Sequence, residues 1–324
     1  MGVLPRRVSL LGERIPVGPS ALVDSLFTEL PSLIPPGDLL ILNTTKVRHA
    51  RLVGSRSSGA PAEVLLIQPG AGDTWIAMGK PGTALQPGKR VEIGPDAWVE
   101  TVEVLADGNR LVRFLGVTAE EAMTRHGRLP LPPYITRAPT ELDEVRYQTV
   151  YARQEGSIAA PTAGLHFTAA MLDDLSARGV LVAGLDLAIG PGTFKPVESE
   201  DPSQHAMHPE PYEIKPRLAA LVERVREDGG RVWAVGTTVV RALETAARED
   251  GTLVTGPGET RLMITPGYAF RVVDRLVTNF HLPRSTLLML VSAFAGRELI
   301  LAAYQYAVTQ RYRFYSYGDA MVIL

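Results

Sequence analysis

Three segments of this chain follow one order: an apolar run, a turn of small or amide-bearing residues, a hydroxyl residue and a helix-forming stretch. They are residues 157–168, 232–238 and 274–286. Because the carboxyl ends of parallel strands meet at one edge of a sheet, we expect these turns to converge. A helix that begins at such a turn offers unpaired backbone N–H groups to a ligand. The pattern predicts a mixed α/β protein with a parallel-type sheet and a site for a polar small molecule.

A simpler explanation is that Thr168, Thr238 and Thr286 only cap helices, as Ser and Thr commonly do. The histidines favour a site, because His166 and His281 stand in two of the three turns and imidazole transfers protons near neutral pH. The turns lack the Walker A loop, the strand-linked G-x-G-x-x-G and the G-x-S-x-G elbow. This argues against phosphate-loop NTPases, Rossmann dehydrogenases and serine hydrolases.

The sequence changes character near Arg51. Short β-rich runs separated by Gly, Pro and Asp-Gly turns follow at 62–68, 74–78, 89–93, 98–105 and 110–115. Such regular spacing is typical of a small barrel or sandwich, and Thr118 with Glu121 forms a capping box for a short helix. We therefore predict an inserted all-β barrel domain over 51–146, within a discontinuous α/β catalytic domain of residues 1–50 and 147–324.

Helical spacing behind a Ser cap predicts a first helix over 20–30 that Pro31 ends. The run 39–42 predicts a buried strand leading into the polar loop 43–46, where ligands bind in open α/β sheets. Further expected elements are strands over 180–189, 232–235 and 271–278 and helices over 169–178, 216–227, 239–247, 287–295 and 297–309.

Composition narrows the classes of function. The net charge is −2, so any nucleic-acid binding must come from a local patch and not from a global basic field. The chain has no cysteine, which excludes disulfides, thiolate metal sites and cysteine nucleophiles. It shows no signal peptide, and its longest apolar segment, 287–295, is too short to span a bilayer. We expect a cytoplasmic monomer that makes no contact with a membrane.

Two segments have competing interpretations. His205, His208 and Glu210 could ligate zinc, but Pro209 interrupts a helix there and no H-E-x-x-H frame is present. One alternative is a loop held by hydrogen bonds. The other, which we favour, is that a histidine of this segment transfers protons. Residues 311–317 interleave Arg with aromatic residues, a pattern that fits stacking on unpaired bases and equally an amphipathic strand packed on the core.

Eight motifs can be recognised together. They are Ala160-Pro-Thr-Ala-Gly-Leu-His-Phe-Thr168 and residues 37–43, 146–151, 192–196, 205–210, 234–241, 278–296 and 312–321. They resemble motifs of the S-adenosylmethionine:tRNA ribosyltransferase-isomerases of queuosine biosynthesis, and motifs this long and this many are highly specific. The resemblance runs in order from about residue 37 to the end, and it implies an α/β domain with a β-barrel insertion.

The resemblance also implies a reaction. Such enzymes move the ribosyl group of S-adenosylmethionine onto 7-aminomethyl-7-deazaguanine at the tRNA wobble position. The ring rearranges to give epoxyqueuosine, and adenine and methionine leave. S-adenosylmethionine would be the cosubstrate, the anticodon loop of tRNA the partner, and no metal is part of the family's chemistry.

That reaction needs a base for the proton beside the sulfonium, an acid for the departing adenine, a dry pocket and a grip on the RNA. We expect proton transfer by His166, His281 and Glu210. We expect cosubstrate binding by Thr162, Gly164, Thr237, Thr238 and Asn279. Contacts to the tRNA, or to the cosubstrate carboxylate, are expected from Lys46, Arg51, Arg241, Arg313 and Tyr315.

The chain departs from the family pattern at a few positions. It lacks the longer acidic-aromatic start, and Asn43-Thr44-Thr45-Lys46 replaces a more usual Asn-Asn/Asp-Thr-Arg. Ala188 stands where the family usually has a His, a strong acid/base candidate. These departures leave two alternatives open: a diverged S-adenosylmethionine-using paralogue with another acceptor, and a non-catalytic tRNA-binding protein.

Overall fold

The chain forms two compact units in the computed structural model, which describes residues 7–11, 22–190 and 207–324. The first unit comprises Met1–Lys46, Gln148–Gln154 and Ala160–Leu324, and the second comprises Val47–Tyr147 and Glu155–Ala159. Each unit has its own hydrophobic core.

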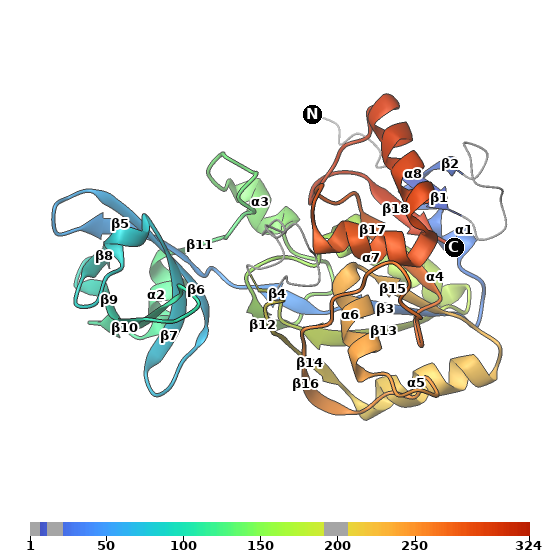
Figure 1. Cartoon of the computed structure of the whole chain (residues 1–324), viewed down its shortest axis with the longest axis horizontal. Coiled ribbons are helices and arrows are strands. Elements are labelled where there is room, and N and C mark those ends of the chain that lie inside the picture. Colours follow the sequence, from blue (N-terminus) through green and yellow to red (C-terminus); the bar gives the residue numbers. More distant parts are fainter. Residues whose placement is uncertain (1–6, 12–21, 191–206) are drawn as a thin grey trace. The chain divides into compact units, whose positions relative to one another are not determined.

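A nine-stranded mixed sheet is the centre of the first unit (Figure 1). Its strands run in the order β16 (Gly256–Thr260), β14 (Glu210–Ile214), β13 (Leu181–Leu187), β3 (Leu39–Asn43), β15 (Val232–Val235), β17 (Arg275–Asn279), β18 (Ala320–Ile323), β1 (Arg7–Leu11) and β2 (Leu22–Leu26). Strands β13, β3, β15 and β17 are mutually parallel. Their carboxyl ends therefore lie at one edge, as predicted for the segments 232–238 and 274–286, and the mixed α/β fold class is confirmed.

Helices cover this sheet. They are α1 (Leu30–Leu33), α4 (Ala169–Ala177), α5 (Pro216–Glu227), α6 (Thr237–Ala246), α7 (Thr286–Ala295) and α8 (Arg297–Thr309), with 3₁₀ turns η2 (Phe27–Glu29) and η4 (Thr162–His166). All five residues of β3 are buried. At its amino end, buried Asp38 accepts hydrogen bonds from Arg231 N (3.0 Å) and Trp233 Nε1 (2.7 Å). These bonds fix the start of β3 beside β15.

The second unit is the expected antiparallel barrel. Its strands run in the order β5 (Arg51–Arg56), β6 (Pro61–Pro69), β7 (Thr74–Lys80), β10 (Arg110–Leu115), β9 (Ala97–Val104) and β8 (Arg90–Gly94), and β5 closes the sheet by pairing with β8. Helix α2 (Ala119–His126) starts at the predicted capping box of Thr118 and Glu121. The remaining elements of this stretch are η3 (Gly82–Ala84), β11 (Gly127–Arg128) and α3 (Glu141–Arg146).

The helix expected over 20–30 is wrong. Within it, Leu22–Leu26 forms edge strand β2, which pairs with β1, and the helical part begins only at Phe27. Pro31 lies in the first turn of α1 and does not end a helix. Proline is tolerated there because the first-turn N–H has no intrahelical partner. Pairing with a strand distant in sequence outweighed the local periodicity.

Two details of the three-turn pattern also need correction. The apolar run 157–160 is no strand of the large sheet; β12 (Gln154–Ser157) pairs with β4 (Thr45–Val47) in a separate two-stranded sheet. Thr168 caps α4 as expected, with its hydroxyl accepting from Met171 N. In contrast, Gly236 and Ser285 precede α6 and α7, so Thr238 and Thr286 lie inside these helices.

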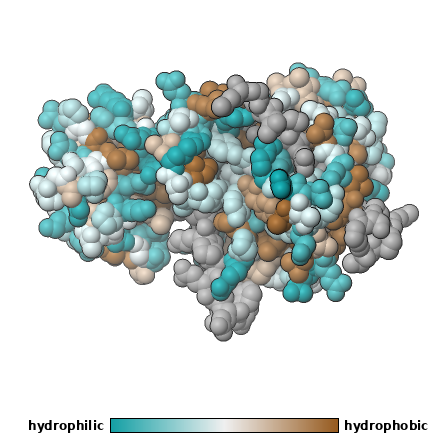
Figure 2. Space-filling model, turned by 90° about the horizontal axis from the view of Figure 1, so that it is seen from above, coloured by the Kyte–Doolittle hydropathy of each residue, from teal (hydrophilic) through white to brown (hydrophobic). Residues whose placement is uncertain are grey.

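Hydrophobic residues reach the surface in scattered patches among hydrophilic ones (Figure 2). Among the described residues, no single helix is long and apolar enough to cross a membrane. Helices α7 and α8 pass that test of length and composition only when taken together, and they are bent by 114° at their junction.

Candidate functional site

The carboxyl edge of the parallel strands carries two polar clusters, both within the first unit. We call Thr162, His166, Asn279 and Tyr315 the Asn279 cluster. We call Glu210, Arg241, Gly190 and Leu262 the Glu210 cluster. Each joins segments far apart in sequence, because strand ends and the turns that follow them meet at this edge.

Asn279, the last residue of β17, is the centre of its cluster. Its Oδ1 accepts a hydrogen bond from Thr162 Oγ1 (2.9 Å), and its Nδ2 donates to the backbone oxygen of Tyr315 (3.3 Å). These two contacts fix the orientation of the amide, because a carbonyl oxygen can only accept. Asn279 thus joins the η4 turn to the C-terminal segment.

The same amide determines which nitrogen of His166 carries the proton. Asn279 Nδ2 lies 3.2 Å from His166 Nε2 and donates to it. Two donors cannot face each other, so Nε2 is the unprotonated nitrogen of a neutral ring. The ring is buried and stacked on Phe27, with centroids 4.9 Å apart. His166 is therefore held in the form that can accept a proton.

His281 is held differently. Its Nε2 lies 2.9 Å from Thr278 Oγ1, and its backbone N donates to Tyr304 Oη (2.7 Å). Burial lowers the pKa of His281 to about 3, because an imidazolium would lose its hydration there. So weakly basic a ring is a poor proton acceptor. Of the two histidines predicted to act in catalysis, His166 has the better geometry.

The η4 turn leaves no room for a side chain at Gly164. A Cβ at this position would lie 1.9 Å from Tyr151 Oη and 2.9 Å from Thr149 Cγ2. The Tyr151 hydroxyl is buried and has no partner among the residues that the structure describes. Burial raises the pKa of this phenol, so it keeps its proton. The turn is thus closely packed and lies against a hydroxyl that can still donate a hydrogen bond.

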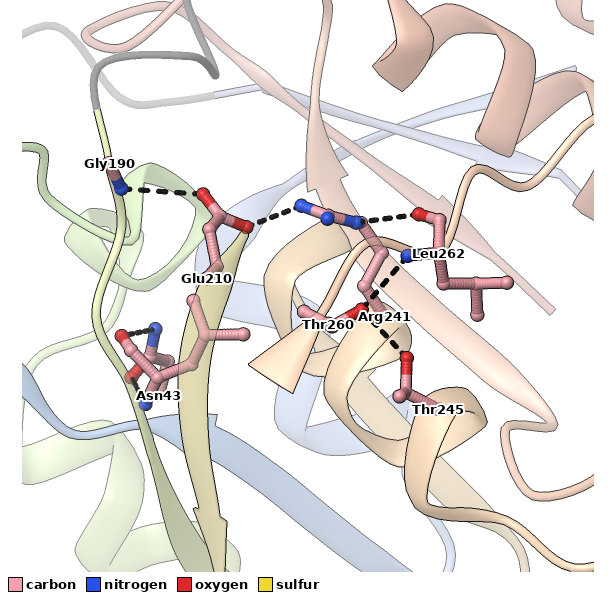
Figure 3. Close-up of polar contacts among 8 residues, drawn as sticks. Asn43, Gly190, Glu210, Arg241, Thr245, Thr260 and Leu262 are labelled. Carbon is pink, nitrogen blue, oxygen red and sulfur yellow. Dashed lines mark hydrogen bonds and ion pairs between the residues drawn. The ribbon is translucent and has the colours of Figure 1, made fainter. Parts of the chain in front are cut away.

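The Glu210 cluster is ionic and almost fully buried (Figure 3). Glu210 forms an ion pair with Arg241 Nη1, and its other oxygen accepts from Gly190 N (3.3 Å). Arg241 Nε donates to the backbone oxygen of Leu262 (3.0 Å). Arg241 Nη2 is buried and has no partner among the described residues. Both carboxylate oxygens are engaged, so proton transfer by Glu210 would first have to break one of these contacts.

Neighbouring polar side chains hold the elements that carry this pair. Asn43 bonds the backbone of Leu187 through Nδ2 (3.0 Å) and Oδ1 (3.2 Å), which ties the end of β3 to the end of β13 (Figure 3). Thr245 and Thr260 share a hydroxyl hydrogen bond of 2.7 Å between α6 and β16. The positions of Glu210 and Arg241 are therefore fixed from several strands.

Helix α6 begins beside the η4 turn. Gly236 has φ of 92°, a conformation that favours glycine, and its N–H donates to Val277 O (2.8 Å). A Cβ on Gly236 would lie 3.7 Å from Ala163 Cβ. Thr237 and Thr238 follow in the first turn, both buried. The structure thus brings the helix amino end and the predicted cosubstrate residues to one place.

The residues expected to contact tRNA are scattered. Lys46 is half-buried in β4, Arg51 of the barrel pairs with Glu63 (2.6 Å), and Arg313 pairs with Asp319 (2.6 Å). Arg241 is only 5% exposed, so contact with an RNA surface needs correction, whereas its alternative role at the cosubstrate carboxylate stays a prediction. The charge that attracts it is Glu210, a pairing that sequence alone does not reveal.

The aromatic C-terminal segment packs inward. Tyr312 is buried, and the rings of Tyr312 and Phe314 lie 5.7 and 5.1 Å from that of Phe280. Of the two interpretations, core packing applies to these rings, although the segment is a turn and not a strand. Tyr315 adopts φ of 70° and presents its backbone to Asn279 and Phe280.

The zinc alternative can be judged only in part, since His205 lies outside the described residues. Within residues 7–11, 22–190 and 207–324, no three His, Asp or Glu side chains could together hold a metal ion. Glu210 takes part in the Arg241 ion pair.

Sequence reasoning missed Phe27, Thr149 and Tyr151 as parts of this region. Phe27 lay inside the wrongly expected helix, so its stacking on His166 was not foreseen. Tyr151 belongs to a motif of the resemblance. The glycine at position 164 was a signal for it, because a glycine often marks a place where a large side chain packs against the backbone. The polar segment 43–46 does follow the buried strand, but it is not a loop: Asn43 ends β3, and Thr45 and Lys46 belong to β4.

Comparisons with known proteins show the family of this chain. The family model described as queuosine biosynthesis protein matches residues 15–323. The S-adenosylmethionine:tRNA ribosyltransferase-isomerase of Symbiobacterium thermophilum is 54% identical over 302 residues, 92% of this chain and 88% of that one. Its namesake in Anaeromyxobacter dehalogenans strain 2CP-C is 49% identical over 326 residues, 99% of this chain and 94% of that one.

A solved structure is also similar. The crystal structure of S-adenosylmethionine tRNA ribosyltransferase from Thermotoga maritima has a TM-score of 0.54 and 33% identity, covering 99% of this chain and 93% of that one. The resemblance inferred from the motifs is thereby confirmed. The chain belongs to the queuosine biosynthesis protein family, which includes the S-adenosylmethionine:tRNA ribosyltransferase-isomerases.

Proposed function

We propose that this protein transfers and isomerises the ribosyl moiety of S-adenosylmethionine onto 7-aminomethyl-7-deazaguanine at the wobble position of tRNA. The product is epoxyqueuosine, and adenine and methionine are released. The observation that carries the proposal is the convergence of Thr162, His166 and Asn279 at the sheet edge. Relatives that carry this activity in their names cover nearly the whole chain.

We assign the first proton transfer to His166. Removing a proton from the carbon beside a sulfonium needs an unprotonated base in a site from which water is excluded. His166 is buried, and its Nε2 is the unprotonated nitrogen. Asn279 would hold this lone pair in position until the cosubstrate displaces the amide. His281, with its pKa lowered to about 3 by burial, would orient neighbouring groups and would not accept the proton.

The cosubstrate would bind against the η4 turn and the first turn of α6. Thr162 supplies a hydroxyl, Gly164 allows Tyr151 to pack closely against the turn, and Thr237 and Thr238 lie at the helix amino end. We assign Glu210 a positioning role, because Gly190 and Arg241 already engage both its oxygens. Lys46, Arg51, Arg313 and Tyr315 remain proposed contacts to the tRNA. The cytoplasmic location and the monomeric state remain predictions.

One observation favours a second candidate, the diverged paralogue. Ala188 directly precedes the Ile189–Gly190 turn that donates to Glu210, and its backbone N donates to Pro211 O (3.0 Å). A methyl group there offers no proton donor beside the ionic cluster. An enzyme with the same cosubstrate pocket and a different acceptor would be compatible with this loss.

A single incubation distinguishes the candidates. Pure protein is mixed with S-adenosylmethionine and tRNA that carries 7-aminomethyl-7-deazaguanine, and the digested RNA is analysed by mass spectrometry. Epoxyqueuosine supports the first proposal. Adenine release without a modified tRNA supports the paralogue, and tRNA binding without adenine release supports a binding protein. A folded His166→Ala protein with normal turnover would refute the role of His166.

A further inference from the structure

A groove outside both polar clusters has no role in the chemistry described above. Strand β13 pairs with β3 along Leu181–Leu185 but with β14 only at Asp186 and Leu187. Among the described residues, its first half therefore has a strand neighbour on one side alone. Since Leu181 N and Leu185 O face β3, Val182 and Gly184 direct their backbone groups to the open side.

A cavity of about 420 Å³ follows this open edge, within the usual size range of small-ligand pockets. Its lining includes three leucine side chains, Leu172 of α4 and Leu218 and Leu221 of α5, which we call the leucine floor. Tyr151, whose hydroxyl approaches the η4 turn, belongs to the same wall. The groove is thus next to the proposed cosubstrate turn and within the same unit.

The rim of the groove is basic. Arg153, Lys215 and Arg217 line it, and all three are exposed. The one carboxylate in the lining is Asp186, which is already engaged by Lys215 Nζ (2.9 Å) and by the Thr44 hydroxyl. The hydrogen bond and charge of Asp186 raise the pKa of Lys215, as does the charge of Glu213, while burial and the charge of Arg153 lower it. These two carboxylates offset part of the positive charge, and Arg153 and Arg217 supply the rest. Such a concentration of cations attracts a polyanion.

Exposed cations around the leucine floor match the chemistry of RNA. Phosphates are held by Arg and Lys, and an unstacked base fills an apolar or aromatic pocket. S-adenosylmethionine fits the rim less well, because its sulfonium and ammonium groups are themselves cationic. We propose that this groove binds an unpaired nucleotide of the tRNA, with its base on the leucine floor and its phosphate against Arg153, Lys215 and Arg217.

This inference rests on the proposed function and extends it to the grip on the RNA. The test is a titration of the substrate tRNA with full-length wild-type protein, Arg153→Ala, Arg217→Ala and the double variant, at several salt concentrations. Arg224→Ala is the matched control, since Arg224 lies on the same helix, has a side chain 75% exposed and is outside the groove lining.

We expect each groove variant to bind tRNA about five- to tenfold more weakly, and the double variant to lower the slope of log K against log salt by about two. Arg224→Ala should change affinity less than twofold. Leu221→Glu, which places a like charge beside the phosphate, should weaken binding as well. The KM for S-adenosylmethionine should stay as in the wild type.

Three results would overturn the inference. The first is a double variant that binds tRNA as tightly as the wild type. The second is an Arg224→Ala control that loses as much tRNA affinity as the groove variants. The third is a groove variant with a raised KM for S-adenosylmethionine and unchanged tRNA affinity. Failure of the proposed function looks different: the wild type then binds tRNA through the groove but forms no epoxyqueuosine. Product formation with groove variants that bind tRNA normally would refute only the groove.

Discussion

The two polar clusters at the sheet edge stabilise their buried polar groups in different ways. The Asn279 cluster is neutral, and each of its hydrogen bonds orients a group: Thr162 orients the amide, and the amide orients His166. The Glu210 cluster consists of a buried ion pair anchored to the backbone at Gly190 and Leu262. The neutral cluster therefore suits proton chemistry, whereas the ion pair fixes the relative position of β14 and α6.

Breaking the ion pair should have the largest effect. Arg241→Met leaves the Glu210 carboxylate buried without its counter-charge, which typically costs about 3–5 kcal/mol. Urea unfolding of the variant measures the loss. The double variant Glu210→Leu, Arg241→Met should recover much of it, because no uncompensated charge remains. A single variant as stable as the wild type would show that the pair contributes nothing to the fold.

A charge in the neutral cluster should impair activity next most. Asn279→Asp places a carboxylate beside His166 Nε2, which favours the imidazolium and raises the pKa of the ring. Since the base must be unprotonated, turnover should fall about tenfold for each unit by which the raised pKa exceeds the pH of the assay. The acid limb of the pH–rate profile should move to higher pH. Asn279→Ser, which adds no charge, should lower turnover without moving that limb.

The packing of the η4 turn gives a third test. Gly164→Ala would place a Cβ 1.9 Å from Tyr151 Oη, and overpacking of this kind costs roughly 1–3 kcal/mol. Adding Tyr151→Phe removes the nearest atom and should recover part of the loss in thermal unfolding. If the two variants are simply additive, the hydroxyl is not what excludes a side chain at position 164.

The lowered pKa of the buried His281 ring predicts that the free energy of unfolding depends on pH. Its pKa is about 3 in the folded protein and near 6.5 unfolded, so the unfolded chain binds one more proton between these values. Stability should therefore be lost as pH falls from about 6.5 to about 3, by up to about 1.4 kcal/mol per pH unit. His281→Gln should flatten this slope in urea unfolding at pH 5 and 7. An unchanged slope would mean that His281 titrates normally.

The smallest effect belongs to the outermost bond of the neutral cluster. Thr162→Val removes the hydroxyl that donates to Asn279 Oδ1 (2.9 Å), and a neutral hydrogen bond contributes about 0.5–1.5 kcal/mol. We expect a similar loss in unfolding free energy and a turnover lowered by less than tenfold. A much larger loss of turnover would assign Thr162 a direct contact with the cosubstrate.

Sequence reasoning succeeded where local signals were strong. The barrel strands, the Thr118 and Thr168 caps and the convergence of the parallel strand ends follow from periodicity, turn residues and sheet geometry. It failed over residues 22–26, where pairing with β1 outweighed an amphipathic pattern. It also did not reveal that Arg241 pairs with Glu210, because no local signal shows that the partner is a carboxylate 31 residues away.

The sequence alone determined the fold class and the family, because both depend on patterns and motifs that are continuous along the chain. Only the tertiary structure decided the protonation state of His166, the burial of the Glu210–Arg241 pair and the exposure of the β13 groove. Each of these depends on hydrogen-bond partners, desolvation or missing strand neighbours. Such properties arise when distant segments meet, and no single segment of the sequence carries them.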